Sequence, residues 1–271
     1  MDAGLPPAVS NLRGAWIIAR YRLRFFRKTL RLQAAFLFAI LLVAVGSLQP
    51  VPPYVDGVIP VVEGFLANGL TQIGFLLAVV PACVLAASGA EWNRGRSGLF
   101  SRSAPHAASI RLSGMWIAAA LGSLMVVFLY AVLVALIAWA RFGSFPIVPW
   151  IEAMGVVALV SLAAVSVASA LSLLFREVLW GITSSLVLLL GLLKVHADLF
   201  TALHQTVPSV PEFLAWNLAS VAPVMTYPLT PAPLFPLLGV TPPPFAAGLL
   251  VIVAWWVGAW LFGWLLTLQE D

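Results

Sequence analysis

Residues 113–140, SGMWIAAALGSLMVVFLYAVLVALIAWA, decide the class of fold, because this long stretch is apolar and carries no charged residue. A helix needs roughly 20 apolar residues to cross about 30 Å of hydrocarbon. The whole chain of 271 residues shares this character, with 62% hydrophobic residues, 9% charged residues and a mean hydropathy of +1.04. The composition predicts an all-α integral membrane protein without a separate soluble domain.

The apolar runs predict six transmembrane helices within residues 33–271. The first run is short and is expected to begin inside the helix that precedes it. A seventh span within the proline-rich region would place the C-terminus on the opposite side, and we favour six. The expected spans are 33–48, 67–88, 113–140, 151–175, 178–195 and 246–268.

The basic residues predict which side of the membrane is inside. Seven of the fourteen Lys and Arg residues precede the first span, and four more lie in the loop between spans two and three. Basic residues near span ends stay cytoplasmic during insertion. A six-span chain that starts inside leaves only Arg141 and Lys194 outside. We therefore expect a multi-pass protein of the cell (cytoplasmic or inner) membrane with both termini in the cytoplasm. The sequence pI of about 9.7 reflects this topology, and no nucleic-acid partner is expected.

The leader, residues 1–32, predicts an amphipathic helix. An apolar stripe lies about a quarter turn from a stripe of arginines at the 3.6-residue period. Such a helix lies in the membrane interface, with its arginines at the lipid headgroups. We interpret the leader as an elbow that runs along the inner leaflet and then turns into span one; a generic insertion anchor is the alternative. The apolar stripe is Leu12, Trp16, Ala19, Leu23, Phe26 and Leu30, and the basic stripe is Arg13, Arg20, Arg24, Arg27 and Arg31.

Residues 198–245 break the pattern of apolar spans, because they contain ten of the chain's twenty prolines. Each proline inside a helix removes a hydrogen bond and clashes with the preceding turn. Irregular backbone at membrane depth persists only where protein or water covers it. The segment is expected to form short re-entrant or interfacial helices on the outer side.

Small residues within the spans predict close helix packing. Gly114, Ala118 and Gly122 follow one another at four-residue intervals, which lets helix backbones approach closely in lipid. In span four, Ser161 and Ser169 lie along one face. These serines, together with the tryptophans at positions 256 and 260 of span six, also suit a substrate route. We favour helix packing for the serines and lipid contact for Trp256 and Trp260.

Motifs for catalysis and for metal binding are missing from this sequence. No HExxH pair and no Ser–His–Asp order is present, and the single Cys83 excludes a multi-cysteine metal site. No phosphate-binding G-x-x-x-x-G-K-[ST] loop is present either. We expect a non-enzymatic chain that binds no cofactor or metal directly. If it transports, its energy must come from a partner or from an ion gradient, and the lack of midplane charges and repeat symmetry favours a partner.

The cytoplasmic loop 89–112 carries the most specific pattern. An acidic residue is followed by a basic residue and glycine, then a leucine, a small residue before proline, and a further basic residue and glycine. With the elbow and the outer segment, this order resembles the membrane subunits of ABC-2-type (type V exporter-like) ABC transporters. The WNRGRSGLF stretch departs from the family's commoner glycine-threonine-leucine version. The matching positions are Glu91, Arg94, Gly95, Leu99, Ala104, Pro105, Arg111 and Gly114.

The resemblance implies that this loop is a coupling helix that docks on a separate ATPase (nucleotide-binding) subunit, which would hold ATP and Mg²⁺. It also implies a second permease subunit, identical or related, and export of a hydrophobic or amphiphilic substrate. A solvated loop with lipid-contacting arginines is the alternative interpretation. Two rival functions remain: a non-transporting subunit that relays ATPase motion to an extracytoplasmic assembly or maturation partner, and an intramembrane enzyme, which the missing polar cluster disfavours.

Overall fold

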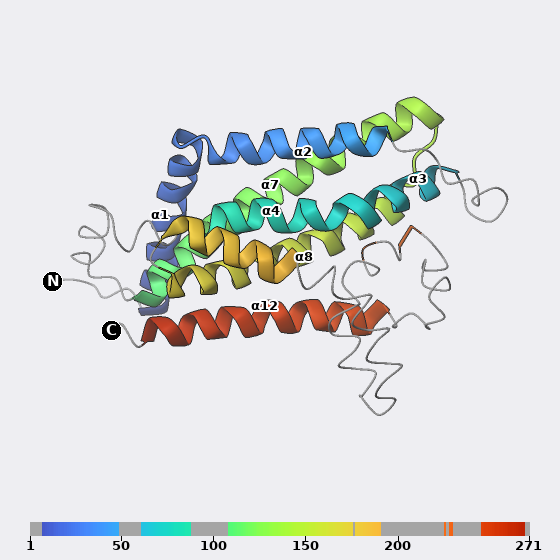
Figure 1. Ribbon diagram of the computed structural model, residues 1–271. Helices are drawn as coiled ribbons and strands as arrows, with labels where there is room; N and C mark the ends of the chain where they lie inside the picture. Colours follow the sequence, from blue (N-terminus) through green and yellow to red (C-terminus); the bar gives the residue numbers. More distant parts are fainter. Residues whose placement is uncertain are drawn as a thin grey trace.

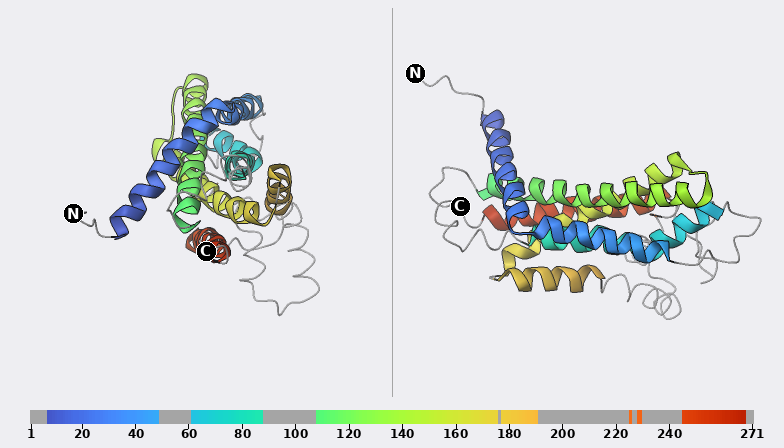
Figure 2. Two further views of the ribbon diagram at one scale, coloured as in Figure 1. Left: turned by 90° about the vertical axis from the view of Figure 1, so that its left-hand side faces the viewer. Right: turned by 90° about the horizontal axis from the view of Figure 1, so that it is seen from above.

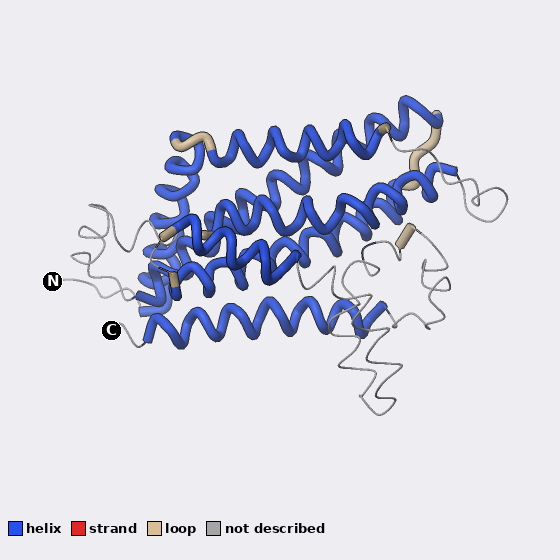
Figure 3. The backbone as a smooth tube through the Cα atoms, in the orientation of Figure 1, coloured by secondary structure: helices blue, strands red, loops and turns tan. Residues whose placement is uncertain are grey.

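The computed structural model describes residues 7–48, 61–87, 108–175, 177–190, 225, 228–229 and 245–268. Within these ranges the chain is helical and contains no strand. Most of the helices lie along one common axis, as Figure 3 shows, while the N-terminal helix runs across them. The predicted all-α class is confirmed for the described part of the chain.

Three long helices are apolar enough to cross a membrane. They are α7 (Ala108–Phe142), α8 (Ile147–Leu174) and α12 (Phe245–Leu268). Helix α8 is the central one, since 72% of its most apolar window is buried, against 33% for α7 and 17% for α12. It packs against both α12 and α4 (Phe75–Ala86). In Figure 1, α4, α8 and α12 run in the same direction, and α7 runs in the opposite direction.

The elbow at the start of the chain is a sharp bend between two helices. Helix α1 (Pro7–Lys28) and helix α2 (Arg31–Ser47) meet at 67°. Leu30 between them has a φ of 60°, which is uncommon for a residue with a side chain. The Thr29 hydroxyl donates to the Phe25 carbonyl oxygen at 2.9 Å, and Gln33 Nε2 donates to the Arg27 carbonyl oxygen at 2.8 Å. The Phe25 carbonyl also accepts the Thr29 backbone N–H at 2.9 Å, and the Gln33 side chain provides a partner for the Arg27 carbonyl, which belongs to the last turn of α1.

The two ends of the bundle are named by the helices that begin and end there. We call the end where α2 and α7 begin the elbow end, because α1 crosses the bundle there (Figure 2). The opposite end, where α2 and α7 finish and α8 begins, is the far end.

Helix α1 stops at Lys28. Leu30 and Arg31, which the sequence analysis places within the leader helix of residues 1–32, therefore lie beyond α1.

The region of the predicted second span, 67–88, lies in an interrupted helix that begins earlier, at Val61. Helix α3 (Val61–Gly69), a π-helical turn (Leu70–Gly74) and α4 follow one another without a gap. At 1.5 Å per residue these elements together measure about 39 Å, which is sufficient to cross a bilayer. A shorter apolar helix, Val178–Leu190, returns from the elbow end beside α4 and α8.

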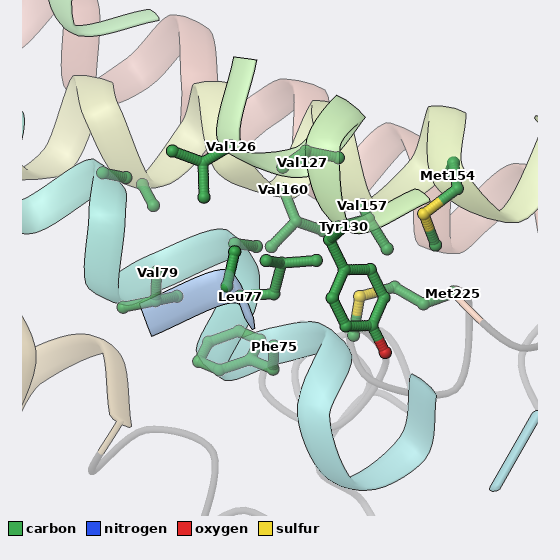
Figure 4. Packing of buried hydrophobic residues seen from close by; sticks show 14 of the residues in the cluster. Phe75, Leu77, Val79, Val126, Val127, Tyr130, Met154, Val157, Val160 and Met225 are labelled. Atoms are coloured by element: carbon green, nitrogen blue, oxygen red, sulfur yellow. The ribbon is translucent and has the colours of Figure 1, made fainter. Parts of the chain in front are cut away.

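The interior is a close-packed apolar core. Tyr130 of α7, Val157 of α8 and Phe75 of α4 meet there, as Figure 4 shows. Met225 and Leu229 of the proline-rich segment are 0% and 1% exposed. Apart from these two residues and Pro228, residues 198–244 lie outside the described part, so the expected re-entrant helices are not tested. The described residues of this segment are nevertheless anchored in protein, as irregular backbone at membrane depth requires.

The fold is that of a multi-pass α-helical membrane protein. Three helices meet the length and composition of a span, or four if α1 and α2 count as one bent span. Helices α4 and Val178–Leu190 are shorter apolar helices that lie among them. Six crossings, and the side on which each terminus lies, remain predictions.

Candidate functional site

A close helix crossing lies at the elbow end, between α1 and α7. A Cβ atom on Gly114 would lie 2.7 Å from the Ala15 carbonyl oxygen and 2.7 Å from Ile18 Cβ. Real Cβ atoms do not approach other heavy atoms so closely, so only glycine permits this crossing. The small-residue stripe predicted at Gly114, Ala118 and Gly122 therefore does pack helices together.

The same stripe continues toward α4. A Cβ atom on Gly122 would lie 2.9 Å from Leu85 Cδ1, and Ala118 is fully buried. Helix α7 thus contacts α1 at its start and α4 about two turns later. Helices α4 and α7 flank the loop 88–107, because α4 ends before this loop and α7 begins after it.

The arginine stripe of α1 is largely exposed. Arg13, Arg20, Arg24 and Arg27 all lie on the surface, whereas Arg31 is half-buried as the first residue of α2. The apolar stripe divides in two: Ala19 and Phe26 are buried, whereas the other members are half-buried or exposed. Leu12 is 73% exposed and Trp16 is 55% exposed. Exposed apolar side chains beside exposed arginines are the arrangement that suits a helix in the membrane interface.

Arg22 is a buried cation that the sequence analysis missed. Its side chain is only 4% exposed. Its guanidinium donates from Nη2 to Met115 Sδ at 3.7 Å and lies 5.4 Å from the Phe25 ring centroid. The sequence offered one signal of this burial: Arg22 does not belong to the stripe that the other arginines of the leader form. Arg22 thereby joins the elbow to the first part of α7.

The predicted coupling positions Glu91, Arg94, Gly95, Leu99 and Pro105 lie outside the described residues. Arg111 is described: it lies in the first turn of α7 and is half-buried. It precedes the α1 crossing at Gly114 by less than one turn. The end of the predicted loop is therefore placed beside the elbow.

Two of the four predicted route residues are buried within the chain, and the other two are half-buried. Ser161 is fully buried and Ser169 is 7% exposed, and both lie on α8. Trp256 and Trp260 are half-buried on α12. The indole of Trp256 stacks on Trp116, with ring centroids 6.0 Å apart and planes inclined by 7°.

Trp116 was also missed in the sequence. Its Nε1 donates to Ser166 Oγ at 2.8 Å, and that hydroxyl donates to the Leu162 carbonyl oxygen at 3.1 Å. With the Trp256 stack, this links α7, α8 and α12. Trp116 lies two positions from both Gly114 and Ala118, so the small-residue stripe gave no signal for it. Ser166 is not on the predicted face of Ser161 and Ser169, but its contacts show that a serine of α8 packs helices together.

Metal and thiol chemistry find no support in the described residues. No group of three or more His, Cys, Asp or Glu side chains is placed to hold a metal ion there. Cys83 is buried within α4 and is a free thiol. The comparisons with known proteins add no family: no protein-family model matches the chain, and no curated protein matches it either. The fold therefore assigns the chain only to a broad class, the multi-pass α-helical membrane proteins.

Proposed function

We propose that this chain is the permease subunit of an ATP-driven ABC exporter. The observation that supports it best is the elbow: an arginine-bearing helix set at 67° to the next helix and packed on α7 immediately after the polar loop. A separate ATPase subunit carrying ATP and Mg²⁺ would supply the energy, and a second permease subunit would complete the pathway. The chain itself would bind no cofactor.

The contacts of the loop-flanking helices suggest how a push on the loop would travel. Helix α4 ends before the loop and α7 begins after it, and the two pack together where Gly122 faces Leu85. Helix α1 is held against α7 at Gly114. Interfaces packed this closely do not deform continuously. A displacement of the loop would therefore move α4, α7 and α1 together as one body.

The apolar surfaces of the described helices support a hydrophobic or amphiphilic substrate. The described core is apolar, and Ser161 and Ser169 are enclosed within the subunit rather than open to a channel. A route between two subunits, along apolar helix surfaces, would suit a hydrophobic or amphiphilic molecule. The cytoplasmic (inner) membrane would be its site, with both termini in the cytoplasm.

The test is directed at the coupling loop. Glu91→Lys reverses a charge that would lock into the ATPase cleft, and Gly95→Trp introduces bulk where the chain would approach the partner. Neither position needs lipid burial, so both variants should insert normally. We expect each to weaken ATPase pull-down or to uncouple hydrolysis from export; Gly258→Trp on α12, where nothing lies within 4 Å, is the bulk control.

Retention of full association and coupling in both loop variants would show that this loop is not the transmission site, and the permease assignment would lose its most specific support. A parent chain that neither binds an ATPase subunit nor couples hydrolysis to export would refute the assignment itself. A complex that couples hydrolysis without moving substrate, and that copurifies with an extracytoplasmic protein, would instead identify a relay subunit.

A further inference from the structure

A small cavity lies where α2, α3 and α7 meet. The centre of a water molecule has about 10 Å³ of room there, which is close to the least that one bound water needs. Gly46 of α2, Gly69 of α3 and Tyr130 of α7 are among the residues that line it. Because glycine has no side chain, α2 and α3 present their backbones to the cavity at Gly46 and Gly69. The cavity therefore has room for one water molecule and for nothing larger.

The Tyr130 hydroxyl is a polar group in an apolar core. The side chain is only 2% exposed, and its hydroxyl has no hydrogen-bond partner among the residues that the structure describes. Figure 4 shows the hydroxyl at the end of the ring that points away from Val126 and Val127, toward the interrupted helix. Tyr130 lies about 18 Å from the far end of α7, at 1.5 Å per residue, so it is deep in the expected bilayer. A hydroxyl at that depth destabilises the fold unless it forms a hydrogen bond.

The backbone around the cavity supplies hydrogen-bond acceptors. Gly69 ends α3 immediately before the π-helical turn, and Gly46 lies beside that turn, because a Cβ atom on Gly46 would lie 3.0 Å from Ile73 Cδ1. The Gly46 carbonyl oxygen accepts the Leu48 N–H. A carbonyl oxygen has two lone pairs, so one that already accepts a bond within its helix can accept a second. The cavity thus combines a hydroxyl with backbone acceptors, whereas cavities that stay dry are lined by apolar groups.

We propose that this cavity binds one structural water molecule that joins α2, α3 and α7. The Tyr130 hydroxyl donates to the water oxygen, and the water donates its two hydrogens to backbone carbonyl oxygens of α2 and α3 where the glycines expose them. About three hydrogen bonds are usual for a buried water. The water holds α3 against α7 next to the point where the interrupted helix widens into its π-helical turn. This inference goes beyond the permease proposal and depends on neither an ATPase partner nor export.

The first experiment is X-ray footprinting of the full chain in lipid nanodiscs. The pulse converts water into hydroxyl radicals, which modify the side chains beside it, and peptide mass spectrometry locates the modified residues. We expect Tyr130 to be modified several-fold faster than Phe26, an aromatic side chain that is 1% exposed and does not line the cavity. Gly69→Ala, which places a methyl group in the cavity, should reduce the rate at Tyr130 to that of Phe26, and Gly258→Ala should leave it unchanged. A parental Tyr130 modified no faster than Phe26, or one unaffected by Gly69→Ala, would overturn the proposal.

The second experiment compares thermal unfolding of Gly69→Ala in two backgrounds. Nothing lies within 4 Å of a Cβ atom built on Gly69, so the added methyl group meets no clash. In the parent chain it displaces the water and leaves the Tyr130 hydroxyl without a partner, so the midpoint of unfolding should fall. In Tyr130→Phe no hydroxyl remains, so the same methyl group fills space in a helix and the midpoint should rise. Gly258→Ala, equally free of contacts, should shift both backgrounds alike. Equal shifts for Gly69→Ala in the two backgrounds would show a dry cavity and overturn the proposal.

Discussion

Replacing Gly114 with alanine tests whether the elbow is held by backbone contact. The added methyl would lie 2.7 Å from a backbone oxygen and from the branched carbon of Ile18, and neither can rotate away. Helix α1 must therefore move off α7. Overpacking of this kind costs about 1–3 kcal/mol. A loss of that size changes the ratio of docked to undocked α1 by roughly 5- to 150-fold.

The assay is limited trypsin digestion of the chain in lipid nanodiscs, since α1 carries exposed cleavage sites at Arg20, Arg24 and Arg27. Gly114→Ala should speed cleavage within α1. Gly122→Ala should have a smaller effect, because its added methyl meets only the flexible end of Leu85 at 2.9 Å. Gly258→Ala should have none. If Gly114→Ala is cleaved at the parental rate, the α1–α7 crossing does not hold the elbow in place.

Three other predictions follow from the same contacts. Ser166→Ala should destabilise the bundle by about 0.5–1.5 kcal/mol in thermal unfolding, because it removes the acceptor of the half-buried Trp116 N–H. Ser172→Ala removes only a hydrogen bond within α8 and should cost less; the reverse order would contradict the hydrogen-bond argument. Replacing Arg20, Arg24 and Arg27 together with glutamate reverses the attraction to anionic headgroups. The variant should therefore misinsert or fail to form the assembled complex, as measured by membrane fractionation. Normal insertion and function would show that the leader is not needed as an elbow. A topology reporter fused after Asp271 should lie on the cytoplasmic side, and one inserted in residues 207–211 should lie on the external side. An external C-terminus would contradict the six-span prediction.

The successes of the sequence analysis are those that depend on local pattern. Four-residue spacing of small side chains identified Gly114 and Gly122 as points of close helix approach, and the 3.6-residue period identified the exposed arginines of α1. The boundary of α1 was misjudged. Leu30 carries no turn signature, yet it takes the left-handed conformation there, because the packing of α1 across α7 decides where the chain bends.

The sequence by itself determined the class of protein, since water cannot solvate so much apolar surface and only helices satisfy their own backbone in lipid. It also determined which residues form the basic stripe of the leader. Tertiary structure alone decided which side chains meet: Arg22 with Met115, Trp116 with Ser166 and Trp256, and Arg141 with Ser47 at the far end. The physical reason is that lipid and protein are similarly apolar environments, so hydropathy does not tell a lipid-facing residue from one between helices. Shape decides that, and shape depends on how all the helices fit together.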